Sequence, residues 1–508
     1  MNLLNDKVIS VRLTDGRNEV LNLPAVLERL CHDKILCFPH LMAHQRQAWY
    51  CFLVQVAALA ALPERGTRSL RAESDWREAL LRLSGNGHGD APWTLVVDDT
   101  RQPAFMQPPA PTRDLQEFQG PLYFPDDLDI LVTSKSHDVK MNRIRRPDLD
   151  HWIFALVVLQ TMHGYLGSGK YGISRMKGGH GSRPFVGLAP CISWGGRFLR
   201  DLAVLLKTHD SVAATHDFKV EGGKKLLWLY PWDEESSLDP SDLDPYYIEV
   251  CRRVRLRLVD GRVAGYTKPT RTTRVAADEL RGNLGDPWIP VERLSGAALT
   301  LSRKGFSYER LQEVLFSSTY LPGAAQKVHD SDSESGLTLI AMGLARGQGE
   351  TQGLHERVVP IPHDARLLIS LDEHRDHIAQ RSKERVENAA ALAKKALRPA
   401  LAALLQGGSE NLDLRNPRLR CWMELFDRRI DEIFFSHLWR TLSLDDEKAR
   451  KTWQQEIASK AREILREAID SLPVPGARRY GAISRAEYLL DRGIYKCFPI
   501  LRARKDDA

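Results

Sequence analysis

The chain of 508 residues contains no run of eighteen apolar residues, and its first residues lack the charged and apolar regions of a secretion signal. Motifs of familiar hydrolases are missing as well: there is no HExxH, no GxSxG and no CxxC pair. His-Asp and Asp-Asp dipeptides do occur, but we interpret them as turn chemistry because no further ligands accompany them. We therefore expect a cytoplasmic, non-enzymatic protein with no membrane partner, no metal and no cofactor.

The seven cysteines are scattered along the chain. Cys31, His32, Cys37 and His40 are close together in the sequence, but their spacing fits no common zinc site, so we predict buried free thiols. Hydrophobic residues make up 43% of the chain and charged residues 27%, which is typical of a globular protein of two or three domains. The net charge of +6 is modest, so the local distribution of charge matters more than the total.

The most informative stretch is residues 164–184, GYLGSGKYGISRMKGGHGSRP, which combines seven glycines with five basic or histidine residues. Glycine lets the backbone approach a ligand closely and adopt positive φ. Lysine and arginine supply charge where bare N–H groups can face phosphate. The stretch, called the glycine-rich loop below, predicts a surface loop that holds a phosphodiester backbone or a nucleotide. A flexible linker is the alternative.

The start of this loop also resembles a mononucleotide-binding P-loop. Gly164 to Lys170 fits G-x-x-x-x-G-K, but Tyr171 occupies the position where Ser or Thr would coordinate Mg²⁺. The apolar run that ends in Asp98 lies upstream of the loop, whereas a metal-holding aspartate usually follows it. The hydrophobic run before the loop, residues 152–162, could be a strand or a buried helix. A P-loop nucleotidase acting on nucleic acid therefore stays open as an alternative, as does a scaffold subunit that does not contact DNA.

The remaining patterns place the loop within an α+β fold. Residues 8–13 alternate ahead of the turn signal Asp15-Gly16 and predict a hairpin, and residues 41–62 predict a buried helix. Residues 246–310 are typical of β-structure, with a turn at residues 260–261.

From about residue 370 the apolar residues follow a helical period, and short connections predict an antiparallel four-helix bundle. Pro399 is expected to kink the first of its helices. We thus predict an irregular α/β N-terminal domain over residues 1–369 and a C-terminal four-helix bundle over residues 370–508. The four predicted helices cover residues 374–406, 417–441, 445–471 and 482–497.

Two further segments are rich in cations. Residues 135–146 contain five Lys or Arg residues and one acid, and residues 265–274 form another cationic loop or hairpin. Only one apolar element separates the first segment from the glycine-rich loop. The two basic loops could therefore emerge near each other and make a single electropositive surface.

The order of these features resembles the large subunit of the type I-E CRISPR surveillance complex, the CasA family of Cascade. The helical bundle occupies the expected C-terminal end, and the glycine-rich loop is similar in length to the family's loop. The other matching segments are residues 2–6 (NLL-x-D), 11–12 (VR), 21–23 (LNL), 105–107 (FMQ) and 339–346 (LIAMGLAR).

The resemblance implies a subunit that recognises the protospacer-adjacent motif in duplex DNA, promotes strand opening and R-loop formation, and docks the helicase-nuclease. It implies four kinds of partner: the CRISPR guide RNA, double-stranded target DNA with its displaced strand, other Cascade subunits, and the helicase-nuclease. A lysine finger would be Lys268 or Arg271, and a glutamine wedge would be Gln326, with Gln348 as the second choice.

Carried over by position, the resemblance also implies two sets of contact residues. The DNA-binding set is Gly164, Gly167, Ser168, Gly169, Lys170, Tyr171, Gly172, Arg175, Lys177, Lys268, Arg271 and Gln326. The loop that contacts RNA or a neighbouring subunit contains Lys135, His137, Lys140, Asn142, Arg143, Arg145 and Arg146.

Overall fold

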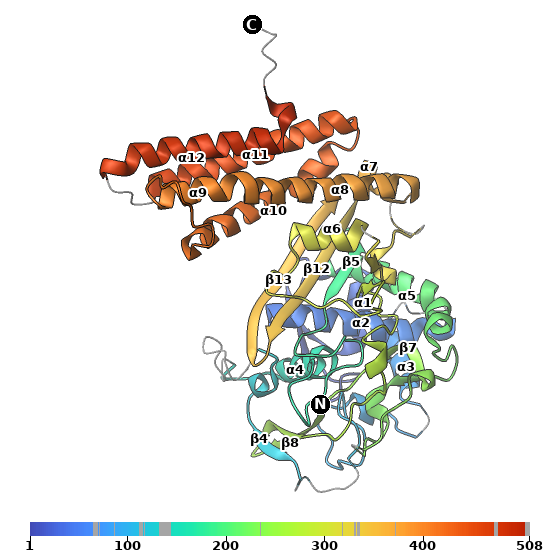
Figure 1. The fold of residues 1–508 in the computed structure, drawn as a ribbon. Coiled ribbons are helices and arrows are strands. Elements are labelled where there is room, and N and C mark those ends of the chain that lie inside the picture. Colours follow the sequence, from blue (N-terminus) through green and yellow to red (C-terminus); the bar gives the residue numbers. More distant parts are fainter. Residues whose placement is uncertain are drawn as a thin grey trace. The chain divides into compact units, whose positions relative to one another are not determined.

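The computed structural model divides the chain into two compact units (Figure 1). Unit 1 consists of Met1–Phe306 and Ser318–Pro360, and unit 2 of Ser307–Ser317 and Ile361–Ala508. Helices and small sheets are mixed along the chain, which confirms the predicted α+β class. The structure describes residues 1–64, 70, 72–85, 87–110, 115, 117–131, 144–233, 235–316, 318–329, 332, 336–370, 372–471 and 476–502.

Unit 1 contains the first five helices and the strands. Its helices are α1 (Leu23–Cys31), α2 (Arg46–Ala61), α3 (Glu73–Leu83), α4 (Leu149–Met162) and α5 (Trp194–His216). Its strands are β1 (Ile9–Leu13), β2 (Asn18–Leu21), β3 (Ile35–Cys37), β4 (Gln119–Leu122), β5 (Phe185–Ala189), β6 (Lys224–Leu226), β7 (Leu243–Ile248), β8 (Arg253–Val259), β9 (Arg262–Lys268), β10 (Val291–Glu292), β11 (Tyr320–Leu321), β12 (Leu337–Gly347) and β13 (Glu350–Ile361), the last of which ends at the unit boundary.

The predicted N-terminal hairpin is confirmed. Strands β1 and β2 pair antiparallel, with Ile9 opposite Leu21, and Gly16 takes a φ of +89° in the turn between them. Helix α1 then begins at the cap residue Asn22, whose side-chain oxygen accepts a 2.8 Å hydrogen bond from the amide of Ala25. The Leu-Asn-Leu pattern at residues 21–23 is thus a strand end, a helix cap and a first helical residue.

The core of unit 1 forms around α2 and α4. Helix α2 packs against α3, α4 and α5, and nearly all of its residues are buried. The run over residues 152–162 is helical, which decides between the strand and the buried helix that its sequence allowed. Its hydrophobic residues surround the helix completely because α4 is buried on all sides, so no amphipathic period marks it in the sequence.

Two three-stranded sheets flank this core. One has the order β13-β12-β5, with β12 antiparallel to β5, and Figure 1 shows β12 and β13 as a long hairpin. The other has the order β4-β9-β8, and the predicted turn at residues 260–261 joins β8 to β9 with positive φ at both positions. Within the predicted β-rich region, residues 246–310, strand β7 ends at Ile248 and β8 begins only at Arg253.

Unit 2 is helical. Helix α8 (Asp372–Leu392) continues through a π-helical turn, Ala393–Leu397, into α9 (Arg398–Leu405). The π turn directly precedes Pro399, which has no N–H to donate to the carbonyl of Lys395, so the expected irregularity at this proline is present. The remaining helices are α6 (Tyr308–Phe316), α7 (His363–Ser370), α10 (Arg420–Arg440), α11 (Asp446–Ser471) and α12 (Gly476–Cys497).

The four predicted C-terminal segments correspond to α8 with α9, α10, α11 and α12. Within unit 2, α12 packs on α9, α10 on α11, and α8 on α11. Helix α6, which comes from the middle of the chain, packs against α8 and α10, and the amide of Tyr308 donates a 2.6 Å hydrogen bond to Asp431. Sequence analysis gave no sign that this short segment belongs with the C-terminal helices.

The cysteine prediction is partly wrong. The thiols are free, but Cys31 and Cys37 are only half-buried, whereas Cys51 and Cys251 are buried. Burial raises the pKa of Cys251 to about 11, so this thiol is not ionised at neutral pH. Across the described residues, every helix is too short or too polar to serve as a membrane span.

Candidate nucleic-acid interface

The glycine-rich loop connects the end of α4 to β5. Its two ends lie side by side, because His163 and Ser182 form an isolated antiparallel bridge and the amide of Arg183 reaches the carbonyl of Met162 at 3.4 Å. The amide of Tyr165 donates to Gly179 at 2.9 Å and crosslinks the two halves of the loop. The loop is therefore an ordered, backbone-bonded structure, which contradicts the flexible-linker alternative.

Close backbone packing explains the glycine at the base of the loop. A Cβ atom on Gly164 would lie 2.4 Å from the carbonyl oxygen of Gly181 and 2.7 Å from that of Gly179. No side chain fits there without moving the backbone of the opposite half. Gly164 thus serves the loop's own packing.

The tip of the loop is a tight turn. The amide of Leu166 donates to the carbonyl of Lys170 at 2.9 Å, and the amide of Lys170 donates back to Gly167 at 3.0 Å. Ser168 and Lys170 are exposed at this turn. The rings of Tyr165 and Tyr171 lie 6.1 Å apart at the base of the tip. The exposed surface therefore offers a hydroxyl, an ammonium group and two aromatic rings.

Buried guanidinium groups support the loop from below. Arg252 donates a 2.9 Å hydrogen bond to the carbonyl oxygen of Gly164, and the amides of Cys251 and Arg252 both donate to the side chain of Gln160 in α4. Burial, followed by the charges of Arg252 and Arg346, holds the pKa of His163 well below its ordinary value. Burial and the charge of Arg252 likewise lower the pKa of Arg346 to about 10. The charges of Arg252 and Arg346 therefore lie close to the base of the loop.

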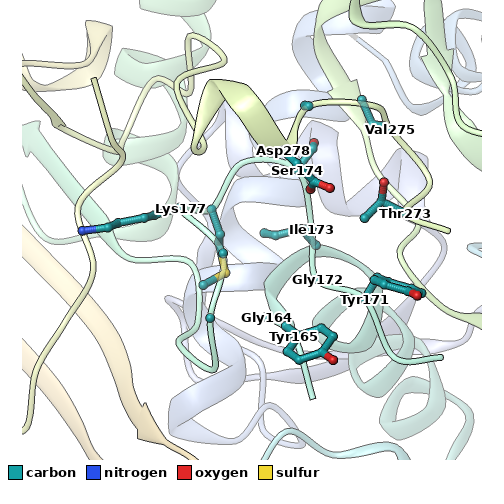
Figure 2. Close-up of a pocket in the computed structure, with 14 residues that line it drawn as sticks. Gly164, Tyr165, Tyr171, Gly172, Ile173, Ser174, Lys177, Thr273, Val275 and Asp278 are labelled. Atoms are coloured by element: carbon teal, nitrogen blue, oxygen red, sulfur yellow. The ribbon is translucent and has the colours of Figure 1, made fainter. Parts of the chain in front are cut away.

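A cavity of about 280 Å³ opens beside the loop (Figure 2). Its floor contains Ser174, whose hydroxyl donates to the buried carboxylate of Glu249 at 2.7 Å. Figure 2 shows the side chain of Lys177 extending away from the other lining residues. The lining consists of Gly164, Tyr165, Tyr171, Gly172, Ile173, Ser174, Met176, Lys177, Gly178, Gly179, Thr273, Val275, Ala277 and Asp278.

The structure brings the glycine-rich loop together with the second cationic segment, residues 265–274. The amide of Thr270 donates a 3.0 Å hydrogen bond to the carbonyl of Gly169. Thr273, with Val275, Ala277 and Asp278 just after the segment, lines the cavity beside the loop. Lys268, at the end of β9, pairs with Glu117, and the exposed Arg271 pairs with Glu235. Both candidate finger residues therefore flank the loop and hold surface acids as partners.

Two predicted DNA-binding side chains lie inside the protein. Arg175 is buried, with its guanidinium 4.3 Å from the centre of the Tyr247 ring and 2.9 Å from the carbonyl of Pro245. Gln326 is buried in a single 3₁₀ turn, Ala324–Gln326, where its amide donates to Trp288 at 2.9 Å and accepts from Gly323 at 3.2 Å. In this conformation neither side chain is available to DNA. The sequence predicted that both residues lie in exposed loops. In the structure Arg175 donates to the carbonyl of Pro245, and Gln326 donates to the carbonyl of Trp288, in the interior.

The second-choice wedge residue has the opposite environment. Gln348 is exposed in the turn between β12 and β13. It follows Arg346 by two residues, and the hydroxyl of Ser182 in the glycine-rich loop donates to the carbonyl of Leu344 in β12. This hydrogen bond ties strand β12, four residues before Gln348, to the base of the loop.

The other cationic segment lies mostly outside the described residues. Arg145 and Arg146 are exposed just before α4, and the amide of Ile144 donates to Asp126 at 3.0 Å. Five residues of the predicted RNA or subunit contact are not among the described residues: Lys135, His137, Lys140, Asn142 and Arg143.

The geometry contradicts the P-loop alternative. A P-loop follows a strand and opens a helix whose N-terminus holds the phosphates. Here α4 precedes the loop and the strand β5 follows it. Lys170 lies at a turn tip with no helix N-terminus after it, so phosphate chemistry of the P-loop type has no support.

Arg252, which donates to Gly164 beneath the loop, and Arg346, whose charge lowers the pKa of His163, were not among the predicted site residues. Arg252 directly precedes β8, where arginine alternates with apolar residues in RVRLRLV and both Arg253 and Arg255 are buried. That alternation was the available signal for Arg252.

No family model and no curated protein matches the chain. Solved structures do match it over nearly its full length. The CasA protein of Thermus thermophilus is 16% identical with a TM-score of 0.66, covering 98% of this chain and 99% of that chain. Thermobifida fusca Cse1 is 14% identical with a TM-score of 0.69, and Acidimicrobium ferrooxidans Cse1 is 14% identical with a TM-score of 0.62, each covering 98% of both chains.

The architecture, an α+β body joined to a helical unit, is therefore that of CRISPR-associated proteins. More particularly, the chain has the fold of CasA, also named Cse1, from its first residues to its last helices. This finding confirms the resemblance that the ordered sequence segments indicated.

Proposed function

We propose that this chain is the non-catalytic large subunit of a type I-E CRISPR RNA-guided surveillance complex, and that its glycine-rich loop reads the protospacer-adjacent motif in duplex DNA. The contact between Gly169 and Thr270 supports the proposal most directly, because it assembles two cationic segments into one surface. The CasA fold, which covers 98% of the chain, supports the proposal that the chain is a subunit of such a complex.

The chemistry of the loop suits the minor groove of DNA. A·T and T·A pairs look alike there, so recognition depends on groove shape, backbone donors and long cations. The narrow tip around Ser168 carries no bulky side chain, and Lys170 is exposed beside it. The buried charges of Arg252 and Arg346 add a positive potential behind the tip without contacting the ligand.

For strand opening we propose Gln348 in place of Gln326. A wedge must occupy the position of a separated base pair, and only an exposed side chain can do so without unfolding its surroundings. Gln348 is exposed in the turn after β12, the strand that is bonded to the base of the glycine-rich loop, whereas Gln326 fills an interior site. The energy of unstacking, a few kcal/mol, would be recovered as guide RNA pairs with the target.

The RNA or subunit contact and the docking of a helicase-nuclease complete the proposal. Arg145 and Arg146, exposed ahead of α4, are the described members of the first contact.

The test uses the complex assembled from the full chain, guide RNA and the neighbouring subunits. Duplex targets carry a randomised flank beside the guide-matched sequence, and bound molecules are sequenced. Lys170→Ala and Lys177→Ala are compared with Lys34→Ala, which removes the same charge from an exposed position between α1 and β3. We expect the two loop variants to lose flank preference and to reduce the salt dependence of log K by about one unit each.

Unchanged flank preference and salt dependence in both loop variants would overturn the assignment of the loop. If instead the wild-type chain fails to assemble with guide RNA and the neighbouring subunits, the assignment to a surveillance complex is wrong. Lys34→Ala should behave as wild type in both measurements.

A further inference from the structure

A second polar cluster, which the proposed function does not use, lies where the segment after β3 meets the start of α4. It consists of His40 together with Asp148, Asp150 and His151. Among the residues that the structure describes, one ligand atom from each of these four lies within 4.8 Å of all the others. His40 is separated from the other three by more than 100 positions, so only the fold brings the four side chains together.

Three of the ligand–ligand distances within the cluster are close to those around a tetrahedral metal ion. His40 Nδ1 lies 3.0 Å from Asp150 Oδ1 and 3.7 Å from Asp148 Oδ2, and His151 Nδ1 lies 3.4 Å from Asp150 Oδ1. Four ligands at zinc–nitrogen and zinc–oxygen bond lengths would be separated by about 3.3 to 3.5 Å. The two imidazole rings are stacked, with centroids 4.6 Å apart. The Nδ1 atoms of both rings lie within 3.4 Å of Asp150 Oδ1.

The hydrogen bonds of His151 are in conflict without a cation. Its Nδ1 accepts from the amide of Asp148 at 3.1 Å, which requires a lone pair on that nitrogen. The same lone pair then lies 3.4 Å from an oxygen of the Asp150 carboxylate, which is also an acceptor. A proton on Nδ1 would satisfy Asp150 but would oppose the Asp148 amide. A metal ion would satisfy both acceptors, with the Asp148 amide giving up its bond to the ring.

Asp150 is held as a preformed ligand. Its side chain is 1% exposed, and the amide of Ser10 in β1 donates to its Oδ2 at 3.0 Å. Both carboxylate oxygens lie 3.0 Å from His40 Nδ1, and Oδ1 also lies 3.4 Å from His151 Nδ1. Asp148, which is 68% exposed, leaves a route for an ion to enter.

We propose that His40, Asp148, Asp150 and His151 bind a divalent transition-metal ion, and that zinc fits the site best. Two imidazoles and two carboxylates form a mixed nitrogen and oxygen set that zinc accepts in tetrahedral geometry, and the two negative charges balance the ion. The ion would fix the segment after β3 to the first turn of α4. This would also fix the position of Arg145 and Arg146, which lie just before α4. The inference replaces our expectation of a protein without metal and does not depend on the proposed DNA-binding role.

The test measures zinc binding to the full chain after treatment with chelator, by competition with a chromophoric chelator and by calorimetry. We expect one zinc ion per chain at micromolar affinity or tighter, and a rise in melting temperature on adding zinc. His40→Gln and His151→Gln should weaken binding by at least about tenfold and abolish the thermal shift. The control is His32→Gln, which removes an exposed imidazole at the end of α1 and should bind zinc as wild type does.

Asp148→Asn keeps the test decisive if a histidine variant fails to fold. Asparagine caps a helix as well as aspartate does, so this change keeps α4 but removes one charged ligand. Weaker zinc binding by a folded Asp148→Asn chain supports the site. Wild-type affinity in all three cluster variants, or a wild-type chain with no stoichiometric zinc binding, overturns it, and the cluster is then an ordinary histidine–carboxylate network.

Discussion

The amide of Thr270 donates a 3.0 Å hydrogen bond to the carbonyl of Gly169, and this bond joins segments that lie one hundred residues apart in the sequence. The contact is tight on both sides. A Cβ atom on Gly169 would lie 2.7 Å from Cβ of Pro269, and Gly169 has a φ of +79°. The tip of the glycine-rich loop is thus positioned by the segment after β9, so changes in either segment should be felt by the other.

This contact predicts that alanine substitutions at two glycines of the loop will differ. Gly178 has a φ of +92° with open space around it, so Gly178→Ala should cost only backbone strain, about 1 kcal/mol of unfolding free energy. Gly169→Ala adds the clash with Pro269, for a further 1–3 kcal/mol by order of magnitude. Urea unfolding of the two variants measures the difference. Equal losses of unfolding free energy in the two variants would mean that Pro269 can move away from the new methyl group without cost.

Local patterns were sufficient for much of this fold. The N-terminal hairpin and the four C-terminal helical segments were predictable because a period of two or of 3.6, with turn residues between, sets each of them locally. Helix α2 was predictable from its length and its run of Ala, Leu and Val, since nearly all of its residues are buried. Residues 152–162 stayed ambiguous for the opposite reason. A helix buried on every side shows no period, and only the packing of α2 against α4 decides its form.

The site was less predictable, because burial depends on distant partners. Arg175 and Gln326 belong to polar, loop-like sequence, yet Tyr247, Pro245 and Trp288 enclose them. The same holds for His40 and Asp150, which meet across 110 positions. A single sequence contains no signal for such pairings, so the glycine-rich loop could be found while its supports could not.

The buried position of Arg175 predicts that this residue stabilises the fold and does not bind DNA. Arg175→Ala removes a cation from the face of Tyr247 and leaves the carbonyls of Pro245 and Leu284 without donors. We expect a loss of about 2 kcal/mol or more in unfolding free energy. Lysine should not rescue it, because an ammonium group lacks the planar fork.

The exposed Lys177, two residues further on, supplies the matched control. Lys177→Ala should change the unfolding free energy by no more than about 0.5 kcal/mol. Chemical denaturation of both variants decides the matter. If the Arg175→Ala chain is as stable as the Lys177→Ala chain, the buried guanidinium of Arg175 does not stabilise the fold.

His437 predicts a loss of stability in acid. It lies in α10 with its ring 5.0 Å from that of Trp453 in α11. Burial, followed by the charges of Arg385 and Arg440, lowers its pKa to about 4. The ordinary histidine pKa is about 6.5. Between about pH 6.5 and pH 4, His437 therefore binds a proton in the unfolded state but stays neutral in the folded state. This contribution to stability is present above about pH 6.5 and is lost as the pH falls toward 4.

Calorimetric melting between pH 7 and pH 4 tests this prediction. His437→Gln should show a smaller fall in melting temperature over that range than wild type, even if it melts earlier at pH 7. His377→Gln, at an exposed histidine of α8, should keep the wild-type pH dependence. Parallel curves for wild type and His437→Gln would place the acid-sensitive group elsewhere.

The two glutamines predict opposite patterns in DNA opening. Gln348→Ala removes an exposed amide at the turn between β12 and β13, so the assembled complex should open duplex targets more slowly while binding pre-melted targets as before. Gln326→Ala removes one of the two donors to the Trp288 carbonyl, which keeps its bond from the Val186 amide, and takes away the side-chain acceptor of the Gly323 amide. It should therefore lower stability and affect both kinds of target alike. Stopped-flow fluorescence with a base analogue beside the motif measures opening, and melting temperature measures stability. The opposite result would make Gln326 the wedge: Gln326→Ala would slow the opening of duplex targets without lowering the melting temperature. The Gln326 side chain would then have to leave its interior site at no cost in stability.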